Sequence, residues 1–310
     1  MFALFTSNRP LERAENIHAV YDAYDGLKNF VQINPYIKNP SVTSWRYNVR
    51  VTDELPGASP GKCVFIGHGM SGGKKYGLDQ PYPYFRKENS RLLTYVIATS
   101  KDMVELTAKQ CGVSPDIVLP YGMPRTDAYF GKLKGDGATF LSEKRSYLFA
   151  PTYRTKEETP LPDIDWDYID GVLTDDEIFV VKRHMLSPYI IRKKYDHIVE
   201  VSCDEPSTPY LVDCDVLITD YSTILMDAHI LGKPVVLFEK QSGYLETRGM
   251  YLDYPYGYAS RYCTNEIDLI DCIRSAEKPQ KEDIVCRRIT AGACDGHSTE
   301  RVVDLIRNIE

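Results

Sequence analysis

The sequence predicts an α/β protein with parallel sheets. Short apolar runs recur along the chain, and each ends in glycine, proline or a polar cluster: "CVFIGHG", "YVIATS", "IVLPYG", "SYLFAPTYR", "IFVVKRH", "VLITDYS" and "PVVLFE". Continuous apolar runs of this length are typical of strands buried on both faces, as in parallel sheets. Helix-like segments such as "KDMVELTAKQCG" separate the runs. Alternation of strand and helix is the pattern of a parallel α/β fold.

Length and composition favour two domains. The chain has 310 residues, of which 43% are hydrophobic, so it can bury a substantial core. The clearest break in composition is "FGKLKGDGATFLSEKR", residues 130–145, where glycine and charge interrupt the pattern before a new apolar run starts at Ser146. We therefore expect an N-terminal domain over residues 1–138 and a C-terminal domain over residues 139–310, whose last helix can pack back on the N-terminal domain.

Charge, cysteine usage and hydropathy exclude several classes of protein. The net charge of -7 argues against a nucleic-acid binder that neutralises phosphates. The eight cysteines include no C-x-x-C pair, which indicates reduced thiols rather than a zinc site or a disulfide framework. Too few apolar residues precede Asn8 for a signal peptide, and no run approaches the ~20 apolar residues of a membrane span. We expect a cytoplasmic protein, with docking on the inner face of the membrane left open.

The first candidate for chemistry is His68. Ligands of parallel sheets bind beyond the carboxyl ends of the strands, so the polar residues that follow each apolar run are the ones to consider. In "IGHGMSGGKKYG" a strand delivers His68 between two glycines, which suits a general base, and Lys74 could add positive charge for a phosphate. The alternative is a strand-end histidine bonded to backbone beside a solvated lysine. Both interpretations remain open.

Other strand ends supply further candidates in the order of the chain. In "LPYGMPRTDAYF", Arg125 and Asp127 follow a strand, and a pairing that fixes the loop is favoured over catalysis. Arg154 closes "LFAPTYR" and could hold an anion with its fork of donors. "FVVKRHML" brings Lys182, Arg183 and His184 to one strand end, where a phosphate would offset their repulsion. Surface salt bridges are the alternative for the lysine and the arginine.

The segment "VLITDYSTILMDAHILGKP" joins a buried strand to a helix. Asp220, Ser222 and Thr223 lie at the junction, and Gly232 and Pro234 mark the helix end. Hydroxyl and backbone N–H groups at such a junction can bind phosphate oxygens, but they can equally just cap the helix. Further on, the loop "EKQSGYLETRGMYLDYPYG" carries Tyr244 and Arg248, and it either closes over a polar ligand or packs its tyrosines.

Taken together, these motifs resemble the CDP-glycerol glycerophosphotransferase family. The resemblance rests on "HG" with a downstream "KKYG", then "GMPRTDAY", "APTYR", the strand-end His184, "DVLITDYSTILMD", "GKPVVLFE" and "YLETRGMY", in the family's order. It implies a GT-B architecture of two Rossmann-like domains, with the acceptor on the N-terminal domain and the donor nucleotide on the C-terminal one. It also implies transfer of glycerol phosphate from CDP-glycerol to a hydroxyl of a glycan or polyol-phosphate acceptor, lipid-linked ones included, in teichoic acid or capsule synthesis.

The resemblance also implies roles for individual residues. His68 would be the general base, with His184 as a second catalytic residue. The donor and its phosphates would contact a further set of side chains, namely Arg154, Asp220, Ser222, Thr223, Asp227 and Arg248. Loop contacts would come from Lys74, Arg125 and Asp127. No metal ligand and no cofactor are expected, since the acidic pairs in "DIDWD" and "VDCDV" do not follow strands.

Departures from the family pattern leave alternatives open. The loop after His68 reads "GMSGGKK" where a threonine-proline pair is common, Met185 stands where proline is usual, and Thr223 replaces a second serine. A CDP-ribitol donor, a GT-B glycosyltransferase or epimerase that uses a UDP-sugar, and a non-catalytic binding protein are the alternatives. The "TDYST" segment with Asp227, together with the downstream "RGMY", favours phosphopolyol transfer.

Overall fold

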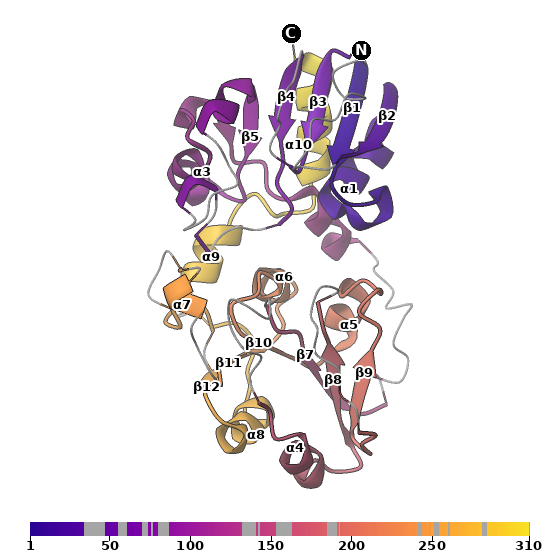
Figure 1. Cartoon of the computed structure of the whole chain (residues 1–310), viewed down its shortest axis with the longest axis vertical. Helices are drawn as coiled ribbons and strands as arrows, with labels where there is room; N and C mark the ends of the chain where they lie inside the picture. Colours follow the sequence, from indigo (N-terminus) through magenta and orange to yellow (C-terminus); the bar gives the residue numbers. More distant parts are fainter. Residues whose placement is uncertain are drawn as a thin grey trace. The chain divides into compact units, whose positions relative to one another are not determined.

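The structure is a computed structural model of the whole chain (Figure 1). It describes residues 1–33, 47–54, 61–69, 74–75, 77–79, 87–131, 141, 143–152, 163–184, 191, 193–240, 244–247, 249–250, 254–259, 261–280 and 284–309. The chain divides into two compact units. Unit 1 comprises Met1–Lys132 and Arg288–Glu310, and unit 2 comprises Leu133–Arg287. The expected boundary after residue 138 lies outside the described residues.

Unit 1 is built on a six-stranded parallel sheet in the order β2-β1-β3-β4-β5-β6. Its strands are β1 (Phe2–Ser7), β2 (Leu27–Gln32), β3 (Val49–Thr52), β4 (Lys62–Phe65), β5 (Tyr95–Ile97) and β6 (Val118–Leu119). Its helical elements are η1 (Leu11–Arg13), α1 (Glu15–Ala23), η2 (Gly77–Asp79), η3 (Lys87–Leu92), η4 (Lys101–Met103), α3 (Val104–Cys111), η5 (Pro115–Ile117), η6 (Pro124–Phe130) and α10 (Ser298–Asn308). Helix α9 (Ile284–Thr290) crosses from unit 2 into unit 1. Strand β3 is buried along its whole length, as expected inside a parallel sheet.

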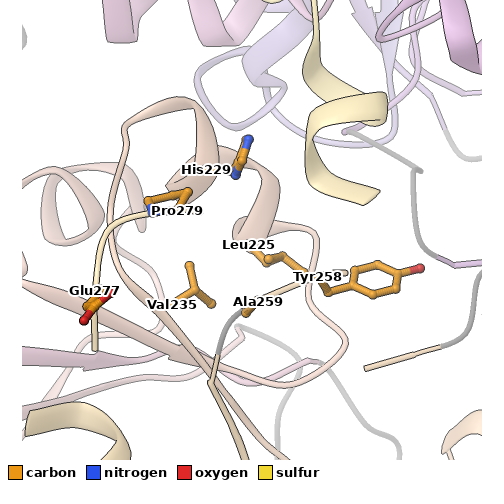
Figure 2. A pocket seen from close by; sticks show the side chains of 7 residues that line it. All are labelled: Leu225, His229, Val235, Tyr258, Ala259, Glu277 and Pro279. Atoms are coloured by element: carbon orange, nitrogen blue, oxygen red, sulfur yellow. The ribbon is translucent and has the colours of Figure 1, made fainter. Parts of the chain in front are cut away.

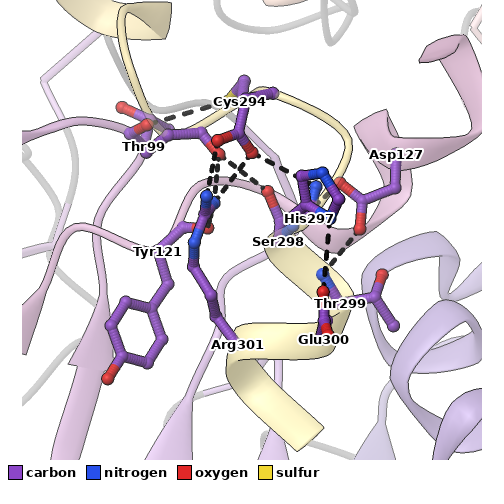
Figure 3. Close-up of polar contacts among 11 residues, drawn as sticks. Thr99, Tyr121, Asp127, Cys294, His297, Ser298, Thr299, Glu300 and Arg301 are labelled. Carbon is purple, nitrogen blue, oxygen red and sulfur yellow. Dashed lines mark hydrogen bonds and ion pairs between the residues drawn. The ribbon is translucent and has the colours of Figure 1, made fainter.

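Helix α10 returns to unit 1 from the far end of the sequence. It packs against α1 and η6, and Figure 1 shows its yellow ribbon within unit 1. Asp127 of η6 holds its first turn, because one carboxylate oxygen accepts the N–H of Ser298 at 3.0 Å and the other the N–H of Thr299 at 2.6 Å (Figure 3). Two donors that have no partner within the helix are thereby satisfied.

Unit 2 holds a second six-stranded parallel sheet in the order β12-β11-β10-β7-β8-β9. Numbered from β7, this is the 3-2-1-4-5-6 order of the Rossmann fold. Its strands are β7 (Arg145–Phe149), β8 (Glu177–Lys182), β9 (Ile198–Val201), β10 (Val216–Thr219), β11 (Val235–Phe238) and β12 (Arg261–Cys263). Its helices are α4 (Trp166–Val172), α5 (Thr208–Asp213), α6 (Ile224–Ile230), α7 (Tyr244–Thr247) and α8 (Glu266–Arg274).

The core of unit 2 is aromatic at one face of its sheet. Phe149 contacts the rings of Trp166, Phe179 and Phe238 at centroid distances of 6.1, 6.1 and 6.2 Å. All four side chains are buried, and such ring contacts add to the free energy gained by burying apolar area. These contacts fix helix α4 against strands β7, β8 and β11. The prediction of an α/β fold with parallel sheets is confirmed in both units.

An ion pair between a buried carboxylate and an exposed arginine connects β8 to the end of helix α8. Glu177 accepts hydrogen bonds from Arg274 Nη2 at 2.6 Å and from the Tyr147 hydroxyl at 2.6 Å. The Arg274 guanidinium, opposed by burial and assisted by Tyr147, lowers the pKa of Glu177 to about 2. Because the folded pKa lies below the ordinary value of 4.5, the stabilisation is present above pH 4.5 and is lost as the pH falls through about 2.

Glu177→Ala should therefore lower the free energy of unfolding of unit 2 by about 3 kcal/mol at pH 7, because the buried hydroxyl of Tyr147 and part of the Arg274 guanidinium lose their hydrogen-bond acceptor. Denaturant unfolding followed by circular dichroism measures this loss. Asp175→Ala removes a fully exposed carboxylate two residues away and should cost less than about 0.5 kcal/mol. Equal losses in the two variants would contradict the assigned role of Glu177.

No helix in the part of the chain that the structure describes is long and apolar enough to span a membrane.

Candidate functional site

Each sheet has one point at which the strand order reverses, and polar residues follow the strands there. In unit 1 this point lies between β1 and β3, and in unit 2 between β7 and β10. Ligands of open parallel sheets bind beyond the carboxyl ends of the strands at such switch points. The residues after β1, β3, β7 and β10 are therefore the ones to consider first.

His68 in unit 1 lies between two carboxylates. It follows β4, and Asp53 and Glu54 follow the neighbouring strand β3. The distance from His68 Nδ1 to Asp53 Oδ2 is 3.1 Å, and that from Nε2 to Glu54 Oε1 is 2.7 Å. The histidine side chain is 23% exposed, whereas those of Asp53 and Glu54 are 2% and 6% exposed. Both ring nitrogens thus face carboxylates, where the sequence left open a bond to backbone.

The two carboxylates control the protonation of His68. Burial by itself lowers the pKa of the ring, but the hydrogen bonds and negative charges of Asp53 and Glu54 outweigh it and raise the pKa to about 9. At neutral pH the ring is therefore an imidazolium that donates both N–H groups. A protein with this arrangement must remove a proton from His68 before the ring can act as a base.

Helix α1 holds the loops that follow β4 and β6. Asn16 is 1% exposed, donates to the carbonyl of Gly67 at 3.0 Å and accepts the N–H of Arg125 at 3.0 Å. Gly67 has φ +65°, a conformation that favours glycine and that turns the chain toward His68. Arg125 forms an ion pair with Glu15 of α1 at 3.4 Å. Asn16 and Arg125 thus position the His68 loop through α1.

The remaining candidates of unit 1 have other surroundings. Both carboxylate oxygens of Asp127 accept backbone N–H groups of α10, so this side chain holds a helix end. Lys74 is partly buried, and the structure describes it together with Lys75. Their proposed role as ligand contacts stays a prediction.

At the switch point of unit 2, Asp220 connects β10 to β7. Its Oδ1 accepts the N–H of Thr152 at 2.7 Å, and the side chain is 2% exposed. One residue earlier, the hydroxyl of Thr219 donates to the carbonyl of Ala150 at 2.7 Å. The chain after β7 is therefore fixed to the chain after β10, directly before Ser222 and Thr223. This contact gives Asp220 a structural role.

Helix α6 begins after Ser222 and Thr223, both of which are partly buried. Thr223 is the N-cap residue by position, with φ -68° and ψ -12°, but its side chain makes no capping hydrogen bond. Capping by the hydroxyl, one of the two interpretations that the sequence left open, is therefore not found at Thr223, because the residue already has helical dihedral angles. Asp227 lies in α6 and is 2% exposed.

Tyrosines cover the chain next to this junction. The ring of Tyr221 stacks on that of Tyr244 at a centroid distance of 4.4 Å and an interplanar angle of 10°. The centroid of the Tyr254 ring lies 4.7 Å from that of the Tyr221 ring. Tyr221 and Tyr244 are 2% and 6% exposed, so packing accounts for Tyr244, one of the two interpretations that the sequence left open.

The three basic side chains at the end of β8 differ in their burial. Lys182 is buried, and its ammonium donates to the carbonyls of Arg183 and Cys203 at 3.3 Å each. Burial lowers the pKa of this lysine. Arg183 forms an ion pair with Glu200 of β9. His184 is exposed. Salt bridging thus accounts for Arg183, while the role of His184 stays a prediction. Arg154 and Arg248 lie outside the described residues.

The described residues of unit 2 line at least two hollows. The cavity in Figure 2 has a volume of about 10 Å³, room for a single water molecule, and the Tyr258 ring points away from its other lining residues. The second has a volume of about 390 Å³ and is lined by Asp163, Asp165, Asp167 and Lys240 among others, an acidic surface that disfavours an anion. None of the described candidate residues lines either hollow.

Sequence reasoning missed Asp53, Glu54 and Asn16. The sequence did contain a signal for Asp53 and Glu54. They directly follow the short segment "VRVT", which forms a strand, and the ends of strands are where ligand contacts are expected. Asn16 gave no signal of its own. In the described part of the chain, no group of three or more His, Cys, Asp or Glu side chains is arranged to hold a metal ion.

Two parallel six-stranded sheets with polar residues at their switch points define an α/β protein of the GT-B-like class. The family model described as "CDP-Glycerol:Poly(glycerophosphate) glycerophosphotransferase" matches residues 36–308. Because this match covers most of the chain, the protein belongs to that family. The expected family is therefore confirmed.

Individual relatives and a solved structure agree with this placement. The chain is 29% identical over 269 residues to a teichoic acid poly(ribitol-phosphate) polymerase of Bacillus spizizenii. The alignment covers 78% of this chain and 42% of the polymerase. It is 27% identical over 264 residues to a teichoic acid glycerol-phosphate primase of Bacillus subtilis, with 80% and 68% covered. The wall teichoic acid polymerase TagF superposes with a TM-score of 0.79 at 18% identity, covering 99% of this chain and 88% of that one.

The chain thus spans less than half the length of the polymerase that it matches. The two relatives also differ in the polyol that their names contain.

Proposed function

We propose that this protein transfers glycerol phosphate from CDP-glycerol to a hydroxyl of a glycan or polyol-phosphate acceptor, with release of CMP, in teichoic acid synthesis. The observation that supports the proposal most is the family match over residues 36–308, which includes β3 and β4 of unit 1 and the switch point of unit 2. Fold alone would not be enough, since the same architecture serves other reactions.

In the proposed reaction, the acceptor oxygen forms a bond to the phosphorus that carries glycerol. The bond from that phosphorus to the oxygen bridging the two phosphates breaks, and CMP leaves with the bridging oxygen. The proton of the acceptor hydroxyl passes to His68. Phosphoryl transfer depends mainly on positioning and charge stabilisation, and a base near the nucleophile assists it.

Unit 2 would bind the donor. His184, Ser222 and Thr223 are the proposed contacts of the pyrophosphate, and Arg154 and Arg248 add cationic donors. Asp220 and Asp227 are buried carboxylates, so we assign them to orienting the chain or a donor hydroxyl rather than to contacting phosphate. Thr152 bonded to Asp220 supports this division of tasks.

CDP-ribitol is the second candidate donor. Its support is the match to a poly(ribitol-phosphate) polymerase, whose identity to this chain differs little from that of the glycerol-phosphate primase.

The test is CMP release from CDP-glycerol and CDP-ribitol, and nucleotide release from a UDP-sugar, each with a polyol-phosphate oligomer as acceptor. We expect turnover of CDP-glycerol at a higher kcat/KM than CDP-ribitol. A reversed preference would support the ribitol donor. Turnover of the UDP-sugar alone would contradict phosphopolyol transfer, and no turnover of any donor would favour a non-catalytic binding protein.

A further inference from the structure

The proposed reaction assigns no task to the two carboxylates that meet at His68. Asp53 Oδ2 lies 3.1 Å from Nδ1 of the ring and Glu54 Oε1 lies 2.7 Å from Nε2. A general base needs one ring nitrogen open toward its substrate, yet both are occupied here. The way in which the two carboxylates are held indicates which ring nitrogen becomes accessible to the substrate.

Asp53 is buried at a cost that packing does not explain. Its side chain is 2% exposed, and among the described residues its Oδ1 has no hydrogen-bond partner. A buried carboxylate oxygen without a partner is unfavourable, and a neutral side chain would avoid that cost. The charge of His68 compensates for this cost, so the negative charge of Asp53 is linked to the protonation of the ring.

The two carboxylates are held differently. Asp53 Oδ2 accepts the hydroxyl of Ser7 at 2.9 Å as well as His68, so the ends of β1 and β3 both fix it. For Glu54, the backbone is held instead, because its N–H donates to Thr52 Oγ1 at 3.1 Å. The described residues give the Glu54 carboxylate no partner besides His68 Nε2. A longer side chain with one partner is the easier of the two to displace.

We propose that Asp53 is a positioning residue that holds Nδ1 of His68, and that Glu54 covers Nε2 in the free protein until an acceptor hydroxyl takes its place. This inference rests on the proposed function. When Glu54 is displaced, the proton on Nε2 passes to solvent. In the step itself, the hydroxyl proton passes to the vacated Nε2 while Nδ1–H stays hydrogen-bonded to Asp53. Asp53 thereby fixes the orientation of the ring and the nitrogen that keeps its proton.

The arrangement has a consequence for the pH dependence of the protein. Among the described residues, Asp53 and Glu54 at the end of β3 are the charged groups that act on the ring, while Ser7 of β1 and Asn16 of α1 are neutral. Loss of either negative charge should lower the pKa of His68 by about 1 to 3 pH units from about 9. The free base then forms at lower pH.

The first experiment is an NMR titration of the His68 ring from pH 5 to 10 in the full chain, with the signal assigned by its loss in His68→Ala. We expect a midpoint near pH 9, lowered in both Glu54→Gln and Asp53→Asn. Glu105→Gln, an exposed carboxylate of α3 in the same unit, should leave the midpoint unchanged. A wild-type midpoint near 6.5, or no shift in Glu54→Gln, overturns the inference.

The second experiment is the pH profile of kcat/KM for CMP release. Glu54→Gln should move the acid limb by the same interval as the NMR midpoint and retain kcat at high pH. Asp53→Asn should also lose kcat by about 10- to 100-fold at every pH, because the ring is no longer held. An unchanged kcat in Asp53→Asn overturns its positioning role. Absence of CMP release from every donor would instead contradict the proposed function, and the titration would still decide the inference.

Discussion

His68→Ala is expected to reduce CMP release from the preferred CDP-polyol by about 10²- to 10⁴-fold, the range that a positioned general base contributes. The loss should appear in kcat, because the proton is transferred only in the reacting state. His184→Ala should act differently, raising KM for the donor through the loss of a phosphate contact. Steady-state kinetics of CMP release over donor concentration separates the two effects.

The matched control is His18→Ala, which removes a histidine of unit 1 that is 40% exposed and paired with Asp22. Its kcat should stay at the wild-type value. An unchanged kcat in His68→Ala would contradict the assignment of His68 as the general base, with either donor.

Gly122→Ala is expected to lower the free energy of unfolding of unit 1 by about 3 to 5 kcal/mol, or to prevent folding. Gly122 has φ +80°, and a Cβ there would lie 2.2 Å from the carbonyl oxygen of Ala293 and 2.4 Å from Ser298 Oγ. Both atoms are engaged, since that oxygen accepts from the Ser298 hydroxyl and from Arg301 (Figure 3). Backbone strain and overpacking therefore add together. Denaturant unfolding measures the loss.

Gly292→Ala is the control for the backbone contribution. Gly292 has nearly the same conformation, φ +79°, but nothing lies within 4 Å of an added Cβ. It should cost only about 1 kcal/mol. Similar losses in the two variants would show that the close approach of the chain to Ala293 does not limit stability.

The interior strands could be predicted because both of their faces are buried. Continuous apolar runs such as "VLIT" and "VVLF" became β10 and β11, each buried throughout. The edge strands gave a weaker signal: in β9, Val199 is exposed and Glu200 partly buried between two buried residues, and β2 has no fully buried position. Partly exposed strands carry mixed sequences, which pattern reasoning does not separate from loops.

Within the candidate site, the sequence identified the residue but not its surroundings. His68 was marked by two flanking glycines at a strand end. Its partners Asp53 and Glu54 follow a different strand, and only the pairing of β3 with β4 brings them to the ring. Asp127 is a similar case, since its partners at Ser298 and Thr299 are about 170 residues away in sequence. Contacts set by topology are not encoded in local spacing.

The return of α10 to unit 1 makes the order of synthesis matter. A chain folds while it leaves the ribosome, N-terminal parts first. Unit 2 is a continuous segment, Leu133–Arg287, and it can complete its contacts as soon as that segment has emerged. Unit 1 must wait, because Ser298, which donates to Asp127 and lies close to Gly122, is synthesised only after the whole of unit 2. The second part of the protein to be made is thus the first that can finish folding.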